Sequence, residues 1–448
     1  MKKLIPILLG AIVLASCATN QKETTAKPED SKENSATTTE ETKNVSDLVP
    51  AEGSALPYNV LVTLPNGTEI RNGGFGSSAT ACPDHNNMFY ALTDRGPNAK
   101  YTGEAGKGKK FPVPDYTPRI GLFKVNDNGS VSMEKEITLK DPSGNPITGR
   151  PNPEGRGTTG EIPYDNDGNV LYYDDYGLDG EGIVALKNGE FWISDEYGPH
   201  IVHYNADGVE LERISPVGVE TGERKLPAVF KRRRANRGME GLAITPDEKT
   251  LVGIMQSTLY NPSKKEVTNP TLTRIVTFNI ETAETHQYLY RQNTKWLSNS
   301  EIRAITDKDF LVIERDGKFS GAEEAQKHIY KISLDGAYDV SGDFDSQEGL
   351  LINEKPLEQC SWEELETAGI TPVKKELVVD VVKTAVNHYP HEKMEGIWII
   401  DNNTLGILND DDFAVSVKDG EVVQKILPGA DVVDSNKLYI IKLETPLE

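Results

Sequence analysis

The chain has 448 residues and a formal net charge of −22, with 70 acidic side chains against 48 Lys and Arg. A surface this acidic repels nucleic acid and anionic lipid and attracts cations, which argues against nucleic acid as a partner. An anionic ligand would therefore need metal ions or a local cluster of Arg to reverse the field. The length suits either two domains or one repetitive β fold.

The first segment has the pattern of an export signal. Lys2 and Lys3 precede a short apolar run over residues 4–14, shorter than the ~20 apolar residues that cross a bilayer as a helix. The run ends in Leu-Ala-Ser-Cys, which resembles the bacterial lipobox at Cys17. An ordinary secretory signal with an incidental Cys is the alternative. The resemblance predicts cleavage before Cys17 and a lipid anchor at the outer membrane, the cell surface or in the periplasm, and Ala18 favours the outer membrane.

Residues 18–50 are rich in Thr, Ser, Lys, Glu, Asn and Pro and contain few large apolar side chains. Such a segment cannot bury enough surface to offset its ordering entropy, so it is predicted to be a disordered tether. The predicted organisation is a signal peptide over 1–17, a tether over 18–50 and a folded domain over 51–448. Within that domain, Cys82 and Cys360 either form a disulfide or remain free thiols, and their spacing does not decide between the two.

The folded domain consists of short apolar or alternating runs separated by Gly, Pro, Asn and Asp, which is typical of many short strands. A single convincing helical stretch covers residues 361–368, where Ser361 is placed as an N-cap. One unit recurs, in which a Glu, followed by Gly in three of the copies, opens an apolar strand, a turn follows, and a second strand ends in polar residues. The unit starts at Glu181, Glu240, Glu301 and Glu395, and in a weaker form at Ser78.

A second hairpin is expected after each copy, with Asn-Gly or Asp-Gly turns at residues 128–129, 207–208, 335–336 and 419–420. A four-stranded sheet of this size cannot bury both faces alone, so neighbouring sheets must stack. Radial stacking predicts an all-β fold, a β-propeller of four-stranded blades. Five units are visible, and strands at 58–64, 69–70 and 437–443 are expected to form a sixth blade from the two chain ends. Five or seven blades remain open.

In each inner hairpin, antiparallel pairing places the leading Glu and the trailing polar residues at the same end of the sheet. Radial arrangement then gathers these ends around one mouth of the central channel. Such a ring of carboxylates needs counter-cations, and calcium, which takes six to eight oxygen ligands, suits it better than zinc. The alternative is a scaffold in which each Glu bonds backbone N–H groups. The predicted metal ligands are Glu181, Asp195, Glu196, Glu240, Glu301, Glu395, Asp94 and Asp410, with Glu314, Arg95, Arg237 and Arg315 in the same layer.

Three motifs in order carry a family resemblance. They are Thr-Asp-Arg-Gly-Pro at 93–97, Glu-Gly-Ile at 181–183 with Phe-Trp-Ile-Ser-Asp-Glu-Tyr-Gly-Pro at 191–199, and Asn-Arg-Gly-Met-Glu-Gly-Leu-Ala at 236–243. Together they resemble the phytase-like propeller family known as "esterase-like activity of phytase", over nearly all of residues 56–448. The chain departs from the family at Gly180, where Pro is usual. The resemblance implies hydrolysis of an ester or phosphoester.

Two hypotheses follow. In the favoured one, calcium ions held by the carboxylates bridge the oxygens of a small anionic ester or phosphoester, Arg95, Arg237 and Arg315 clamp the phosphate, and Glu314 accepts the proton of water. In the alternative, a non-catalytic propeller binds a ligand or partner at the channel mouth and calcium is structural. Under both hypotheses the protein is expected to be a monomer held to the membrane through lipid on Cys17.

Overall fold

The computed structural model describes residues 44–219, 222–385 and 388–448, which belong to one compact unit. The predicted signal peptide, the lipidation site Cys17 and residues 18–43 of the predicted tether lie outside the described residues. The unit begins earlier than predicted, because Val45 in the short helix η1 (Val45–Asp47) is buried in the core. None of the described helices is long and apolar enough to cross a membrane.

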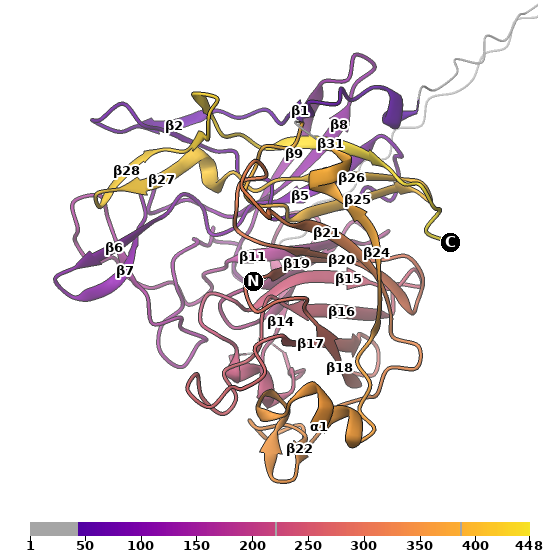
Figure 1. The fold of residues 1–448 in the computed structure, drawn as a ribbon. Coiled ribbons are helices and arrows are strands. Elements are labelled where there is room, and N and C mark those ends of the chain that lie inside the picture. The colour runs from indigo at the N-terminus through magenta and orange to yellow at the C-terminus, as the bar shows by residue number, and fades with distance from the viewer. Residues whose placement is uncertain (1–43, 220–221, 386–387) are drawn as a thin grey trace, which may run out of the picture. The chain divides into compact units, whose positions relative to one another are not determined.

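Five four-stranded antiparallel sheets make up the body (Figure 1). The first strands of the sheets, β4, β11, β15, β19 and β25, contact one another in a closed ring. The predicted β-propeller is therefore confirmed. The strands of the five blades are β4 (Ser78–Ala81), β5 (Met88–Leu92), β8 (Arg119–Val125) and β9 (Val131–Thr138); β11 (Gly180–Ala185), β12 (Phe191–Asp195), β13 (Ile201–Tyr204) and β14 (Glu210–Ile214); β15 (Met239–Ile244), β16 (Thr250–Met255), β17 (Leu272–Asn279) and β18 (Thr285–Arg291); β19 (Ser298–Ala304), β20 (Asp309–Arg315), β21 (Lys327–Ser333) and β24 (Lys374–Asp380); and β25 (Gly396–Asp401), β26 (Thr404–Leu408), β31 (Lys437–Lys442) and β1 (Ser54–Ala55).

The described residues form five such blades, whereas six were expected. The two chain ends complete the fifth blade instead of adding another, because β31 occupies the free edge of β26 and β1 then pairs with β31. The strands expected in a sixth blade, β2 (Val60–Thr63) and β3 (Glu69–Arg71), form a separate two-stranded ribbon. The hairpin predicted around the turn at 419–420 is also a separate ribbon, of β27 (Val415–Lys418) and β28 (Glu421–Gln424).

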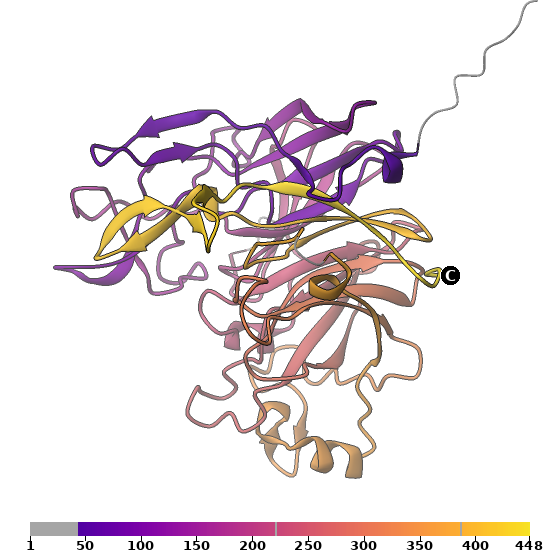
Figure 2. The same cartoon turned by 45° about the horizontal axis from the view of Figure 1, so that its top comes forward.

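A collar of small sheets lies on one side of the propeller. It comprises the ribbons β2–β3 and β27–β28 and a three-stranded sheet of β6 (Ala99–Gly103), β7 (Gly106–Lys110) and β10 (Ile162–Tyr164). Both views place these sheets together (Figures 1 and 2), and β27 contacts β6. The three-stranded sheet lies outside the Glu-Gly repeats, so the repeat pattern did not predict it.

The fourth blade contains a long excursion between β21 and β24, so the turn at 335–336 does not close a direct hairpin. The excursion carries the predicted helix as α1 (Trp362–Thr367), with a capping box between Ser361 and Glu364. Cys360 is buried beside it, and neither Cys360 nor the buried Cys82 forms a disulfide. The remaining elements are η2 (Ala228–Arg232), β22 (Leu351–Ile352), β23 (Lys355–Pro356), η3 (Leu357–Gln359), α2 (Val381–Thr384), η4 (Asp412–Ala414), β29 (Ile426–Leu427) and β30 (Val432–Val433).

The core is divided among the interfaces between neighbouring blades. Between the first and fifth blades, the ring of Phe89 stacks on Phe123 and on Trp398, with centroids 5.4 and 5.0 Å apart. Burying one large apolar side chain contributes about 1.5–3 kcal/mol. Aromatic packing therefore stabilises the joint at which the first and last blades close the ring.

Candidate functional site

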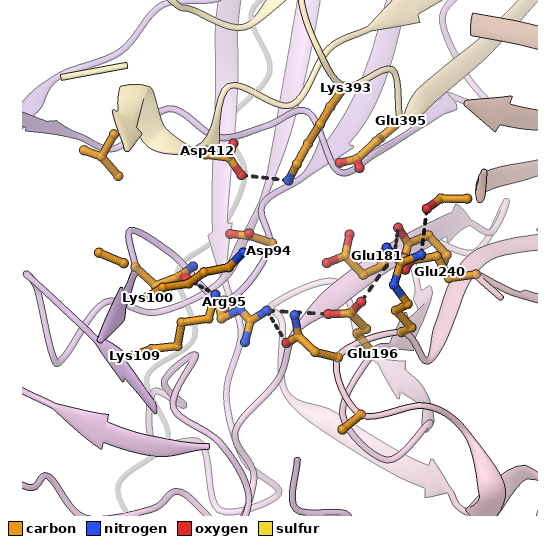
Figure 3. A pocket seen from close by; sticks show the side chains of 18 of the residues that line it. Asp94, Arg95, Lys100, Lys109, Glu181, Glu196, Glu240, Lys393, Glu395 and Asp412 are labelled. Atoms are coloured by element: carbon orange, nitrogen blue, oxygen red, sulfur yellow. Dashed lines mark hydrogen bonds and ion pairs between the residues drawn. The ribbon is translucent and has the colours of Figure 1, made fainter. Parts of the chain in front are cut away.

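A cavity of about 690 Å³ opens where the inner strands begin (Figure 3). Its wall mixes charges of both signs in a protein whose net charge is −22. The low-dielectric surroundings of such a cleft focus the field of these groups. The wall carries six carboxylates, Asp94, Glu181, Glu196, Glu240, Glu395 and Asp412, and seven basic side chains, Arg95, Lys100, Lys109, Arg234, Arg237, Arg315 and Lys393.

Two copies of the Glu-Gly repeat, in β11 and β15, reach the cavity through β-bulges. The register of β11 skips Glu181, and that of β15 skips Glu240. A bulge leaves one residue unpaired and re-aims its side chain. The following glycines are needed for close approach, since a Cβ on Gly182 would lie 2.5 Å from the backbone N of Leu242. Glu therefore faces the cavity, while Gly lets the inner strands pack around the channel.

Glu301 does not follow this pattern, although its sequence predicts it. In β19 the skipped residue is Ser300, so Glu301 occupies the position that Gly182 holds in β11 and Gly241 holds in β15. Glu301 is fully buried in the channel, where its Oε2 accepts hydrogen bonds of 2.6 Å from Ser78 Oγ and Arg303 Nη2. Burial raises the pKa of Glu301 to about 8. The structure thus places Glu301 one layer below the cavity wall, outside the predicted ring.

Three carboxylates lie close enough to share one cation. Asp94, Asp179 and Glu181 are buried, and each offers an oxygen within 4.8 Å of the others. Burial and neighbouring carboxylates raise the pKa values of Asp94 and Glu181 well above the ordinary range. The charges that act most strongly on Glu181 are all carboxylates, Glu240 first. Because all the donors are hard carboxylate oxygens, the cluster could hold a calcium ion.

Asp179 is the member of this cluster that the sequence analysis missed. It lies two residues before Glu181, outside any repeated pattern. Its Oδ1 accepts a 3.2 Å hydrogen bond from the backbone N–H of Arg95, and its Oδ2 lies 2.9 Å from Arg95 Nη2. Arg95 therefore fixes the orientation of Asp179 and balances part of the charge of the cluster.

Glu196 and Glu240 form the next part of the wall, joined by one amide. Gln256 Nε2 donates to Glu240 Oε1 and lies 3.4 Å from Glu196 Oε1. The other oxygen of Glu240, Oε2, is buried and accepts no hydrogen bond from the described residues. Burial raises the pKa of both glutamates. A buried carboxylate oxygen without a partner on a cavity wall is free to bind a ligand, a water or a proton.

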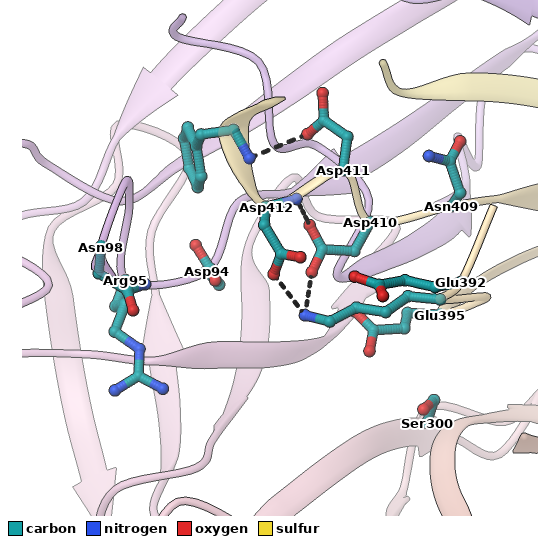
Figure 4. A network of polar contacts seen from close by, with 12 residues as sticks. Asp94, Arg95, Asn98, Ser300, Glu392, Glu395, Asn409, Asp410, Asp411 and Asp412 are labelled. Atoms are coloured by element: carbon teal, nitrogen blue, oxygen red, sulfur yellow. Dashed lines mark hydrogen bonds and ion pairs between the residues drawn. The ribbon is translucent and has the colours of Figure 1, made fainter. Parts of the chain in front are cut away.

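Asp410, another predicted ligand, lies beside the cavity behind a lysine. Lys393 Nζ donates to Asp410 Oδ2 at 2.5 Å and to Asp412 Oδ1 at 2.7 Å (Figure 4). Burial raises the pKa of Asp410 to about 7. Asp412, which was not predicted, faces the cavity from η4, where Asp412, Phe413 and Ala414 all have positive φ angles of 51°, 58° and 59°. Such conformations are rare outside glycine and concentrate at functional sites.

Two further predicted residues lie away from the cavity wall. Asp195 is fully buried and accepts a 2.9 Å hydrogen bond from the backbone N–H of Asp179, so it supports the cluster from behind. Burial raises the pKa of Asp195 to about 6. Glu314 is also fully buried and accepts hydrogen bonds from Tyr290 Oη at 2.7 Å and Lys375 Nζ at 2.6 Å. Both of these bonds reach Oε2, and Oε1 accepts a 3.0 Å hydrogen bond from the backbone N–H of Asn293, so Glu314 is not placed to activate water in the cavity.

Comparison with known proteins now identifies the family. The model described as "Phytase-like: Esterase-like activity of phytase" matches residues 70–413. The chain belongs to the phytase-like family. The match includes most of the cavity wall.

One curated relative of this phytase-like chain is an uncharacterized secreted protein of Arthroderma benhamiae. It is 25% identical, and the match covers 68% of this chain and 75% of the relative. An endo-arabinanase from Bacillus licheniformis is 11% identical, with 83% of this chain and 94% of that chain covered and a TM-score of 0.32. The Cps50 (Swd1) β-propeller domain of Myceliophteria thermophila is 12% identical, with 80% and 98% covered and a TM-score of 0.32. The fold assignment rests on the sheet topology of this chain.

All three predicted arginines line the cavity of the phytase-like propeller. Arg237 Nη1 donates to Ser298 Oγ at 3.0 Å, and burial lowers its pKa. Arg315 pairs with Glu395 and lies 4.0 Å from Glu240. Burial alone would lower the pKa of Arg315, but these two carboxylates raise it well above its ordinary value. The arginines therefore remain charged and divide their contacts between wall carboxylates and the open cavity.

The basic residues that the sequence analysis missed come mainly from outside the repeats. Lys100 and Lys109 lie on β6 and β7 of the collar, and Arg234 lies in the loop before β15. The basic run at residues 231–234 was the available signal for Arg234. For the collar lysines the sequence carries a Gly-Lys-Gly-Lys-Lys run at 106–110, but nothing in it indicates which cavity the run faces.

Proposed function

We propose that this protein is an exported, calcium-assisted hydrolase of small anionic esters, phosphoesters above all, that acts in the 690 Å³ cavity. The observation that carries the proposal is the cluster Asp94, Asp179 and Glu181, two members of which line the cavity beside seven basic side chains, while Asp179 lies buried behind them. Oxygen clusters bind hard cations, and Arg and Lys bind phosphoryl oxygens. Membership of the phytase-like family supports the same reaction class.

Asp94, Asp179 and Glu181 would hold the calcium ion. Their oxygens already converge, and burial together with neighbouring carboxylates raises the pKa values of Asp94 and Glu181, which a bound cation would lower again. When bound, the ion would polarise the ester oxygen and lower the pKa of a coordinated water. Asp195 and Arg95 support the cluster by fixing Asp179 in place.

The remaining wall residues supply orientation and proton transfer. Arg237, Arg315 and Lys393 face the cavity and are suited to orient a phosphoryl group through charge-assisted hydrogen bonds. Glu240 presents an unpartnered Oε2 on the same wall, and we assign it the acceptance of the water proton in place of Glu314.

A second candidate function is a non-catalytic propeller that binds a ligand or partner and uses calcium as a structural ion. The observation that favours it is the extent of internal pairing, since Arg95 contacts Asp179 and Arg315 contacts Glu395. Arginines already paired with carboxylates have fewer donors left for a substrate. Under this function no ester would be hydrolysed, and calcium would raise only the stability.

Export and anchoring complete the proposal. The secreted relative supports export, and lipid on Cys17 would hold a monomeric enzyme at the membrane. Replacement of Cys17 by Ser tests the anchor. The variant should lose the mass of the acyl chains and move from the membrane fraction to the soluble extracytoplasmic fraction, and retention in the membrane fraction would contradict the anchor.

The function itself is tested with chelator-treated protein and a panel of phosphomonoesters, phosphodiesters and carboxylic esters, with and without calcium. We expect turnover that depends on calcium and is lost in Glu240→Gln. The matched control is Glu376→Gln, because Glu376 is exposed on β24. Calcium-dependent stabilisation without hydrolysis of any ester would instead establish the binding propeller.

A further inference from the structure

A second cavity, of about 670 Å³, adjoins the first at the collar. The two cavities share three wall residues, Lys100, Lys109 and Asn236. The first cavity contains the carboxylate cluster, whereas the second is lined by β6, β7 and the loop at 159–161. A molecule that occupies both cavities must therefore pass this shared wall.

The two lysines of the shared wall form an unfavourable pair. Lys100 and Lys109 stand directly opposite each other in the β6–β7 ladder. Like charges in that position repel each other, and an electronegative group bound beside them offsets the repulsion. Lys109 is only 9% exposed, and its Nζ donates to Asn98 Oδ1 at 2.8 Å. The arrangement indicates that the electronegative part of a ligand is received at this wall.

The position of Lys109 is tightly fixed. Gly108 precedes it, and a Cβ on Gly108 would lie 1.8 Å from the carbonyl oxygen of Ile162, so β7 is pressed against β10. Asn98 in turn donates from Nδ2 to the carbonyl of Gly96 at 3.0 Å, which holds its Oδ1 toward Lys109. A side chain held by its strand and by a braced partner is preorganised for one direction of approach.

We infer that Lys109 is the catalytic acid that protonates the leaving group of the ester, an inference that rests on the proposed function. The phosphoryl group would occupy the first cavity beside the carboxylates, and the alcohol part would occupy the second. The bond between phosphorus and the leaving oxygen breaks as water forms a new bond to phosphorus. The proton of Lys109 Nζ moves to the leaving oxygen, which departs as an alcohol, and the amine regains a proton from solvent.

The electrostatic surroundings of Lys109 suit this role. Burial lowers its pKa from the ordinary 10.5 to about 8, and the charge of Arg95 acts in the same direction. Glu161, Asp179 and Glu196 act in the opposite direction and keep the group protonated at neutral pH. An acid whose pKa lies near the working pH transfers its proton more readily than an ordinary lysine.

The experiment compares two phosphate monoesters that differ in their need for an acid, 4-nitrophenyl phosphate and ethyl phosphate. The nitrophenolate leaves without a proton, whereas the ethoxide does not. In Lys109→Met we expect kcat for ethyl phosphate to fall by about 10²–10⁴-fold, the usual contribution of a general acid. For 4-nitrophenyl phosphate we expect kcat to change by less than about tenfold. In the wild type, kcat for ethyl phosphate should fall above about pH 8 as Lys109 loses its proton. With 4-nitrophenyl phosphate this fall should be absent.

Two further variants separate proton transfer from charge. Lys109→Arg keeps the charge but cannot release its proton at this pH, so ethyl phosphate should remain a poor substrate. Lys100→Met removes the partner charge and should lower the turnover of the two substrates by the same factor. Equal losses in Lys109→Met, or restored ethyl phosphate turnover in Lys109→Arg, would overturn the inference. If the wild type hydrolyses neither compound, the proposed function fails instead.

Discussion

At the mouth of the channel, Glu181 is surrounded by other carboxylates and Glu240 leaves one oxygen without a partner. One layer deeper, Glu301 is fully buried, but a hydroxyl and a guanidinium donate to its Oε2 and the backbone N–H of Ile302 donates to its Oε1. All three residues open the same sequence repeat. The difference comes from a register shift of one residue in β19, which exchanges the bulged position for the glycine position. A buried Glu is therefore scaffold or site according to whether donors meet its oxygens.

The sharpest way to break this comparison is to make the same substitution in both layers. Glu181→Gln removes a predicted cation ligand, and we expect kcat/KM to fall by about 10⁴-fold, equivalent to ~5.4 kcal/mol of transition-state stabilisation. Glu301→Gln keeps one oxygen acceptor, which Ser78 and Arg303 already share in the wild type, and should change kcat/KM by less than about threefold. Steady-state kinetics below the melting temperatures of both variants provides the measurement. Similar losses in the two variants would erase the distinction.

The free energy of unfolding should respond in the reverse order, so that replacing Glu301 costs more stability than replacing Glu181. Glu301→Ala leaves the buried guanidinium of Arg303 without its ion-pair partner, and we expect the free energy of unfolding to fall by about 3–5 kcal/mol. Glu181→Ala removes a repelled charge and should not destabilise the calcium-free protein. Urea denaturation of the calcium-free proteins measures both. Replacing Arg303 by Met in the Glu301→Ala background should restore part of the loss, and a further loss would contradict the ion-pair explanation.

Calcium should stabilise the folded protein only by binding to the carboxylate cluster at the channel mouth. At a free concentration of 100 times its Kd, an ion bound to the folded state alone adds about 2.7 kcal/mol to the free energy of unfolding. Asp179→Asn should abolish this gain, because Asp179 is one of the three converging ligands. Melting curves over a calcium series provide the measurement, with Glu376→Gln as the control that keeps the full gain.

The pH dependence is the smallest expected effect. Burial raises the pKa of Asp195 to about 6 and of Asp410 to about 7, both from an ordinary 3.8. Because these folded-state values exceed the unfolded one, the folded state binds the protons more tightly. Their stabilising contribution is present below pH 4 and is lost as the pH rises through 6 and 7. We expect the calcium-free protein to lose about 1–3 kcal/mol over this window. Urea denaturation at several pH values tests this, and stability that rises over the window would contradict it.

The sequence was sufficient to predict the parts of the fold and the site that follow from a repeated local pattern. The Glu-Gly units predicted the propeller, and they placed Glu181, Glu240 and Glu395 on the cavity wall together with the arginines. In β11 and β15 the bulge and the glycine belong to the hairpin itself, so these repeats carry their own geometry. The capping residue Ser361 likewise predicted α1 from four residues of chain.

The rest depended on contacts between distant segments. Whether β31 completes the fifth blade or begins a sixth is decided by which edge is free, and no repeat records that. Asp179 and Lys109 lie outside the repeats. Asp179 directly precedes β11, and Lys109 lies on β7 of the collar. For Glu301 a local signal existed, since aligning Ile302 with Leu242 places Ser300 under the repeated Glu. A shift of one residue was enough to move a carboxylate from mouth to channel.

The most direct test of the account is a calorimetric calcium titration of the chelator-treated protein, carried out on the wild type, Glu181→Gln and Glu301→Gln. We predict that the wild type and Glu301→Gln bind calcium with similar affinity and that Glu181→Gln loses binding. Calcium binding by Glu181→Gln with the affinity of the wild type, or no binding by the wild type, would contradict the assignment of the cation site to the channel mouth.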